Sequence, residues 1–284
     1  MTIGILYESK EWSVFALREH IETAGVPVKL IDLQEVLDPA ALFSCSLIVN
    51  RVFASAVFRG HKKALEQMEG VIELLDGKSI PMINPAEAHY YETSKARTKE
   101  ALSEKGFAVP VLYGMIDPAG TGESLELKYP CVVKPDCGGR TNYTFIINDQ
   151  EELTESLKDV PDVLFIAEEF IPPAYGFVTR IEVIDRECRL AVKRSVTKSG
   201  LSAYHLGSGY EIYKDLPVEI RDAAINAMEC LHIEVGSLDI IENETGFYII
   251  DVNSVSNVSE DNTEMFDFDL MANTAAYAVE RYYA

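Results

Sequence analysis

The sequence lacks the features that mark several protein classes. No run of about 18 apolar residues, the minimum for a membrane-spanning helix, occurs in its 284 residues. The opening MTIGILYESKEW has no basic start followed by the apolar stretch of a signal peptide. Basic residues are scarce, 25 against 46 acidic ones, which gives a formal net charge of −21. Such a chain should repel nucleic acid and anionic lipid, so we expect neither a nucleic-acid partner nor a membrane.

Cysteines are also few, and several familiar motifs are missing. The five cysteines are scattered and never spaced as C-x-x-C, which fits a reducing, cytoplasmic setting. There is no G-x-x-x-x-G-K-[ST], no G-x-S-x-G and no zinc-like spacing of histidines, and the segment 207–209 lacks the third glycine of a dinucleotide fingerprint. These absences argue against P-loop, Rossmann, serine-hydrolase and zinc sites.

What is present is an ordinary globular composition, 48% hydrophobic and 25% charged, with a regular start. Ile3 to Tyr7 is a short apolar run, and Val14, Leu17 and Ile21 then recur at helical spacing. Further strands are expected at 28–31, 46–52 and 80–83, with a helix around 61–75. The order of these elements predicts an α/β lobe of βαβ units over residues 1–88.

The rest of the chain predicts a mixed α+β architecture. We expect a helix capped by Thr93 or Ser94, an acidic helix at 149–158, a helix that begins at Pro217 and a last helix from about Phe268. The strand-like segments are 130–134, 144–147, 164–170, 179–184 and 189–196, and a hairpin joins 237–241 to 247–252.

The hairpin predicts a metal site. Asp251 and Asn253 are two residues apart on one strand, so their side chains leave the same face. Folding about a turn near 243–246 brings Asp239 to within about one register step of Asp251. A single Asp at a strand end is more often just near solvent. However, Asp251 follows the apolar run 248–250, where an unpartnered carboxylate would be costly, and oxygen ligands of this kind suit Mg²⁺.

A lysine at the end of a buried strand is the second candidate. Lys134 closes the strand of the segment YPCVVKP and is followed closely by Gly138 and Gly139. Such a lysine either extends to solvent or meets an anion, and the glycines allow the backbone to approach phosphate oxygens. Lys134 is therefore expected to lie nearest the glycines.

Taken in order, these pieces resemble the ATP-grasp superfamily over essentially the whole chain. The resemblance is strongest to the branch of the ribosomal-protein glutamate ligase RimK and the LysX-type ligases of lysine biosynthesis. The segments that carry it are Ser94-Lys95, GFAVP (106–110), YPCVVKP (129–135), AEEFI (167–171), Gly176 with Arg180, Lys193-Arg194, GSLDII (236–241) and IIDVN (249–253).

The resemblance implies a role for each of these positions. Lys95 and Lys134 would contact ATP phosphates, Gly138 and Gly139 would cover them, and Arg180 and Arg194 would lie where the phosphoryl group meets the activated carboxylate. The adenine would be held by the segment Glu168, Glu169, Phe170 and Ile171. The metal, Mg²⁺ or Mn²⁺ in its place, would be bound by Asp239, Asp251 and Asn253.

The implied fold is an N-terminal βαβ lobe followed by two α+β lobes that clasp ATP, with bounds at 1–88, 89–171 and 172–284. The implied activity is ADP-forming ligation of a carboxylate to an amine through an acylphosphate. The substrates would be small molecules or peptides, and a homo-oligomer is left open. The alternatives are an ATP-grasp kinase acting on a small-molecule hydroxyl and a degenerate member that binds ATP without turnover.

Three departures from the family pattern concern the metal and the acceptor. Asp251 stands where the relatives usually have Glu, Ser254 to Asn257 replaces the usual Asn-x-x-Pro-Gly continuation, and Val178 replaces an acidic residue. For the first lobe, we expect Arg51 or Arg59, in a locally basic segment, either to bind a substrate carboxylate or to mark a solvated helix start.

Overall fold

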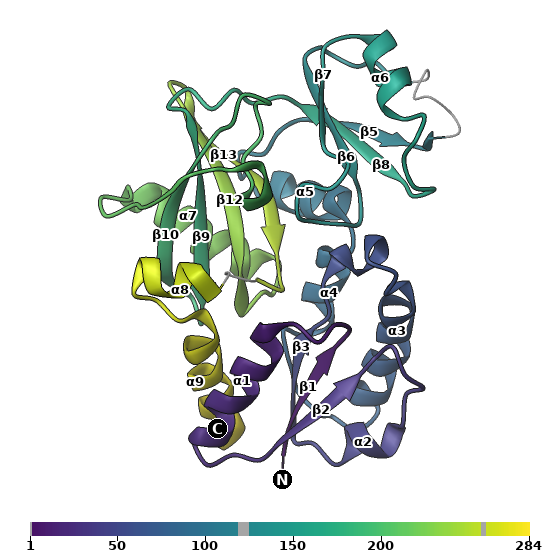
Figure 1. The fold of residues 1–284 in the computed structure, drawn as a ribbon, viewed down its shortest axis with the longest axis vertical. Helices are drawn as coiled ribbons and strands as arrows, with labels where there is room; N and C mark the ends of the chain where they lie inside the picture. Colours follow the sequence, from purple (N-terminus) through teal and green to yellow (C-terminus); the bar gives the residue numbers. More distant parts are fainter. Residues whose placement is uncertain (1, 119–124, 257–259) are drawn as a thin grey trace.

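The computed structural model describes residues 2–118, 125–256 and 260–284. Its strands form three sheets, one parallel and two antiparallel. Figure 1 shows the parallel sheet at the bottom and the two antiparallel sheets side by side above it. No helix in the described ranges is long and apolar enough to cross a membrane.

The first sheet has the strand order β2-β1-β3-β4, and its pairs are parallel. Its two central strands are buried along their whole length, as expected for strands covered on both faces. The elements are β1 (Ile3–Tyr7), α1 (Trp12–Thr23), β2 (Val28–Asp32), α2 (Pro39–Phe43), β3 (Leu47–Arg51), η1 (Ala54–Phe58), α3 (Lys62–Asp76), β4 (Met82–Ile83) and α4 (Ala86–Glu92).

The second sheet has the order β5-β8-β6-β7 and is preceded in the chain by α5. Ser94 caps α5 by accepting a hydrogen bond from the Arg97 amide, so of the two expected caps it is the one used. The elements are α5 (Lys95–Glu104), β5 (Leu112–Ile116), β6 (Cys131–Pro135), β7 (Phe145–Ile147), α6 (Gln150–Ser156) and β8 (Phe165–Glu169).

The third sheet has the order β11-β10-β9-β12-β13, and helix α7 packs on one of its faces. Pro217 stands at the N-cap of α7 rather than inside it. The elements are β9 (Phe177–Ile184), β10 (Glu187–Ser195), η3 (Tyr204–Leu206), β11 (Tyr210–Ile212), α7 (Val218–Cys230), β12 (Val235–Asn243), β13 (Gly246–Asn253), α8 (Glu260–Phe266) and α9 (Leu270–Tyr283).

Two helices also pack against distant parts of the sequence. Helix α5 packs against α7 and β13, so Leu102 belongs to the core of the third sheet. Helix α9 returns to the first sheet, where Leu270 and Met271 share a core with α1 and β1. Figure 1 shows α9 beside α1. The division at residues 88 and 171 stays a prediction, and these two helices connect the parts that it separates.

The expected strands and helices are present, with ends that shift by a few residues. Sequence reasoning missed β5, β11 and the short helices α2, α4 and α8. These elements have seven residues or fewer, too short for a hydrophobic period to distinguish them from loops.

Candidate active site

The β12–β13 hairpin brings two carboxylates face to face. Its register pairs Asp239 directly with Asp251 and Ser237 with Asn253, with a bulge just after Asp239. Directly opposed residues in an antiparallel pair point to the same side of the sheet. Asp239 and Asp251 therefore lie side by side, as the position of the turn predicted. Metal binding by these residues stays a prediction.

Cations surround both carboxylates. Nζ of Lys95 lies 3.0 Å from Oδ1 of Asp251, and Nη2 of Arg194 lies 2.5 Å from Oδ2 of Asp239. Nη1 of Arg180 is 3.5 Å from Oδ1 of Asp239. Burial by itself would raise the pKa of Asp251, but the ammonium groups of Lys95 and Lys134 outweigh it and lower that pKa to about 2. Asp251 is thus ionised at any physiological pH.

The donor set fits Mg²⁺ better than a metal that needs several protein ligands. Among the described residues there is no cluster of three or more His, Cys, Asp or Glu side chains suited to a metal. Two carboxylates and the Asn253 amide are a normal protein contribution for Mg²⁺, which completes its shell with water and phosphate oxygens. Oδ1 of Asp239 is also buried and accepts no hydrogen bond from any described residue.

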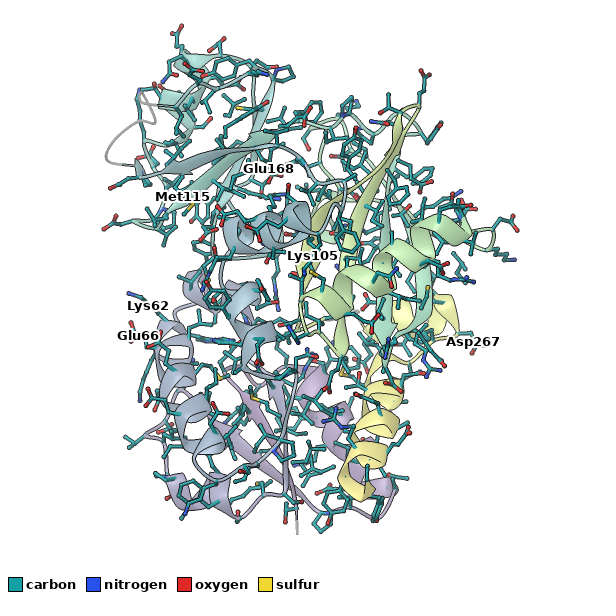
Figure 2. All side chains as sticks on the ribbon, turned by 180° about the vertical axis from the view of Figure 1, so that it is seen from behind. Lys62, Glu66, Lys105, Met115, Glu168 and Asp267 are labelled. Atoms are coloured by element: carbon teal, nitrogen blue, oxygen red, sulfur yellow. The ribbon has the colours of Figure 1, made fainter. Side chains whose placement is uncertain are left out.

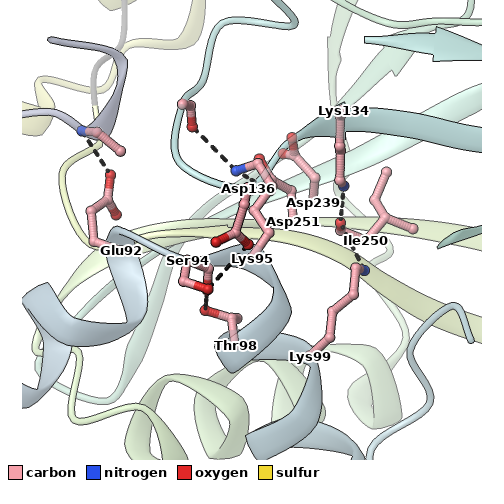
Figure 3. A network of polar contacts seen from close by, with 12 residues as sticks. Glu92, Ser94, Lys95, Thr98, Lys99, Lys134, Asp136, Asp239, Ile250 and Asp251 are labelled. Carbon is pink, nitrogen blue, oxygen red and sulfur yellow. Dashed lines mark hydrogen bonds and ion pairs between the residues drawn. The ribbon is translucent and has the colours of Figure 1, made fainter. Parts of the chain in front are cut away.

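Three charged side chains from three elements, Lys99, Lys134 and Glu168, meet close to this hairpin. Figure 3 shows the two lysines on either side of Ile250. The Glu168 carboxylate of β8 lies 3.0 Å from Nζ of Lys134 on β6 and 3.0 Å from Nζ of Lys99 on α5. Both lysines also donate to the backbone carbonyl of Ile250, at 3.0 Å and 3.4 Å respectively. Figure 2 shows Glu168 in the middle of the molecule, above α5. The Glu168 side chain is therefore engaged by lysines, and the backbone of Glu168 and Glu169 is paired in the second sheet.

Lys99 is a site residue that sequence reasoning missed. It is one helical turn after Lys95 on α5, so both lysines lie on the face that meets β13. Burial lowers the pKa of Lys99 to about 8, with Glu168 opposing the shift and Lys134 adding to it. The i, i+4 spacing of the two lysines was the signal available in the sequence.

The loop between β6 and β7, residues 136–144, is called the glycine loop below. Nζ of Lys95 donates to the Gly138 carbonyl at 3.2 Å, whereas Lys134 contacts Glu168 and Ile250. The expectation that Lys134 lies nearest the glycines is therefore wrong, because α5 aims Lys95 at the loop. Asp136 holds the start of α5 by accepting from Ser94 Oγ and the Ala96 amide.

A first cavity, of about 130 Å³, lies between the second and third sheets. Its apolar lining includes Val132, Ile171, Val178 and Ile241, and two lysines also line it. The predicted nucleotide residues line it together: Lys95, Lys134, Gly138, Gly139, Glu168, Glu169, Phe170 and Ile171.

A second cavity, of about 430 Å³, lies between the third sheet and the first lobe. It includes both arginines, Arg180 and Arg194, together with Asn253. The two cavities share a boundary that contains both carboxylates, one arginine and the glycine loop: Gly138, Gly139, Thr141, Arg194, Asp239 and Asp251. A group bound at this boundary can be reached from either side.

Arg180 lies in a dense network in the second cavity. Its Nε donates to Glu182 at 2.7 Å, and its Nη2 donates to the hydroxyls of Ser237 and Ser256 at 2.6 and 2.8 Å. Glu182, itself buried, accepts from Ser256 as well. Sequence reasoning missed Glu182, although strand period places it on the same face as Arg180.

The two arginines expected to bind a substrate carboxylate do not line either cavity. Arg51 is buried and donates to the Ser256 carbonyl at 2.7 Å and to Ser13. Arg59 pairs with Glu8 and Glu11. Arg51 thus links β3 to the segment that follows β13, and Arg59 links the segment after η1 to the segment between β1 and α1. The residues of this basic segment that do line the second cavity are Phe53, Ala54 and Ser55.

Comparisons with known proteins agree on one family. A family model described as an ATP-grasp domain matches residues 93–255. The D-alanine--D-alanine ligase of Pediococcus pentosaceus is 32% identical over 152 residues, which cover 49% of this chain and 42% of that protein. The chain thus matches less than half the length of this relative.

Two further matches extend over nearly the whole chain. The ribosomal protein bS6--L-glutamate ligase of Escherichia coli O139:H28 is 24% identical over 276 residues, with 89% of this chain and 88% of that protein covered. A solved structure, the RimK domain protein ATP-grasp from Sphaerobacter thermophilus, has a TM-score of 0.73 at 17% identity and covers 98% of this chain and 99% of its own.

Proposed function

The chain belongs to the ATP-grasp domain family, and from that membership we propose that it is an ATP- and Mg²⁺-dependent ligase that joins a carboxylate to an amine. The α/β and α+β fold class expected from the sequence is confirmed by the likeness to solved structures. The observation that carries the activity is the shared boundary of the two cavities, where Arg194, Asp239 and Asp251 meet the glycine loop.

The lining of the first cavity suits the base and phosphates of a nucleotide. Its apolar walls, among them Ile171, Val178 and Ile241, match the faces of a purine. Residues 170 and 171 follow the end of β8, and their backbone groups would meet the purine edge. Lys95 and Lys134 line the same cavity and supply positive charge for phosphates. We place the terminal phosphate of ATP at the boundary with the second cavity.

Asp239 and Asp251 at that boundary, with Asn253 on the side of the second cavity, would hold Mg²⁺. Bound there, the ion supplies neutralisation of phosphate charge during transfer. Arg194 and Lys95 now pair with the same carboxylates, so both cations are within reach of the phosphates and of a substrate carboxylate. The protein contributes position and charge rather than a covalent nucleophile.

The chemistry follows from the weakness of a bare carboxylate as an electrophile. A substrate carboxylate in the second cavity attacks the terminal phosphorus of ATP, ADP leaves, and the resulting acylphosphate has a leaving group on carbon. A substrate amine then displaces phosphate and forms the amide. Arg180 and Arg194 face this point and stabilise the developing negative charge. The substrates are small-molecule or peptide acids and amines.

Product analysis tests the proposal. With ATP, Mg²⁺ and a panel of acids, hydroxylamine in place of the amine should yield a hydroxamate and ADP in equal amounts. With ¹⁸O in the substrate carboxylate, the label should appear in phosphate after amide formation. Release of AMP and pyrophosphate, phosphorylation of a hydroxyl, or ATP binding without any ADP would each contradict the ligase assignment.

A further inference from the structure

One face of β10 is apolar at one end and basic at the other. Leu190, Val192 and Arg194 are spaced by two, so all three point to the same side of the third sheet, and all three line the second cavity. The register pairs Leu190 with Glu182 and Val192 with Arg180. The strand therefore presents an arginine at the boundary with the first cavity and two apolar side chains away from it.

Two aromatic residues complete the apolar end. Phe266, from α8, packs with Leu190 and Val192 in one buried cluster, with Tyr210 of β11 against it. Tyr210 and Phe266 also line the second cavity, and their ring centroids are 6.3 Å apart. This cluster supplies the cavity with an apolar wall, beside the paired side chains of Arg180 and Glu182 on the neighbouring strand.

The arginines of the second cavity are already paired with carboxylates. The described Lys and Arg side chains that line it are Arg140, Arg180 and Arg194, and the remaining basic side chain in its lining is His205 of η3. Arg140 pairs with Glu11 at 2.6 Å, and the other two arginines pair with Glu182 and Asp239. A substrate carboxylate can displace Arg194 from Asp239 at the boundary. A second acidic group on the substrate, placed against Leu190 and Val192, would meet apolar atoms and lose its solvation without gaining a partner.

We propose that one of the two substrates is an amino acid, free or at the end of a peptide, whose side chain is uncharged and apolar. Its carboxylate lies toward Arg194, and its side chain lies against Leu190, Val192 and Phe266. A cavity of about 430 Å³ is in the range of small-molecule sites. This inference rests on the proposed function, because it takes the cavity boundary as the place of acyl transfer.

Binding tests the inference separately from turnover. Calorimetry with Mg²⁺ and a non-hydrolysable ATP analogue would compare leucine, methionine and phenylalanine with glutamate and lysine. Each is used in both enantiomers, as the free acid, the amide and the N-acetyl derivative. We expect at least one apolar compound to bind tenfold or more tightly than its charged counterparts. Equal or tighter binding of glutamate or lysine, or no binding by any of them, would overturn the proposal.

Two variants of the wall give an independent check. Val192→Ala should enlarge the apolar end and shift relative affinity from leucine toward phenylalanine by fivefold or more. Leu190→Arg should shift it toward glutamate by tenfold or more. Ile212→Val is the matched control, because Ile212 packs against the same cluster without lining the cavity, and its preference should equal that of the wild type.

The two proposals fail in different ways. Should Val192→Ala and Leu190→Arg change the affinity for every compound by the same factor, the wall does not select the side chain and this inference is wrong. Tight binding of apolar amino acids without ADP release from any pair would support the inference and contradict the ligase activity.

Discussion

Asp251 and Lys95 neutralise each other's charge in the site before any ligand binds. The two side chains form a partly buried ion pair at 3.0 Å, and the lysine also donates to the Gly138 carbonyl. An unpaired charge in such a place would be costly, so each group keeps the other ionised until phosphate and metal arrive. The pairing explains how an Asp in an apolar strand is tolerated.

Asp251→Asn should abolish activity while the fold persists. The change removes a charge with little change of shape, so ADP release should fall by about 100-fold or more. Mg²⁺ dependence of turnover and circular dichroism would be measured together. Glu66→Gln, an isosteric change at an exposed position on α3, whose residues line neither cavity, is the control (Figure 2). Unchanged turnover of Asp251→Asn at limiting Mg²⁺ would refute the metal assignment.

Lys99 gives a prediction on pH and stability. Its pKa is about 8 in the folded protein against 10.5 ordinarily, so between these values the unfolded chain binds more protons. The free energy of unfolding from this group therefore rises as the pH rises from about 8 to 10.5, by at most about 3 kcal/mol.

Lys99→Met should remove that rise. Urea unfolding of the wild type and the variant would be compared at several pH values across this window, and the difference in free energy should change with pH. Lys105→Met, at an exposed lysine just after the same helix, should leave the pH dependence as it is. A constant difference between Lys99→Met and the wild type would contradict the prediction.

At the scale of elements, the glycine loop rests on the first lobe. Arg140 of the loop pairs with Glu11 at 2.6 Å, and the ring centroids of Tyr143 and Phe58 are 5.3 Å apart. Gly138 lies so close to η1 that a Cβ would be 2.5 Å from the Phe58 ring. The loop over the phosphate end of the first cavity is thus shaped by a helix of another lobe.

The two glycines of this loop should differ sharply in tolerance. Gly138 has a φ of +154° and no room for a Cβ, whereas a Cβ on Gly139 would lie 3.7 Å from Ser55. We expect Gly138→Ala to lower kcat/KM for ATP about tenfold or more, since loop position controls phosphate contact. Gly139→Ala is the matched control and should stay within about threefold. Equal effects of the two changes in ADP-release kinetics would contradict this account.

At the scale of the molecule, helix α9 packs into the core of the first lobe. Met271 is fully buried against residues of α1 and β1, and His20 of α1 contacts Asp269 at 3.0 Å. The end of the chain therefore stabilises its beginning. Because α8 and α9 follow one another, the same connection also positions Phe266 at the second cavity.

Met271→Ala should destabilise the protein by about 2–5 kcal/mol, the usual result of removing a large side chain from a core. Tyr283→Ala is the control on the same helix, because Tyr283 is 70% exposed, and it should change stability by less than about 0.5 kcal/mol. Urea unfolding measures both. A change below about 1 kcal/mol for Met271→Ala would show that α9 contributes little to the first lobe.

The sequence by itself determined the local elements and one long-range pairing. Strand and helix periods located most elements, and the turn at 243–246 brought Asp239 and Asp251 together because a hairpin's register follows from its turn. Family motifs in their order identified the fold.

Only the tertiary structure decided which charges meet. Arg51 contacts Ser256, 205 positions away, and Lys99 contacts Ile250, 151 positions away. A hydrophobic period records which face of an element is buried and carries no information on the partner that covers it. For this reason the sequence did not predict three features that depend on how the lobes pack together. They are the Lys99–Glu168–Lys134 cluster, the packing of α9 on the first sheet and the apolar wall of the second cavity.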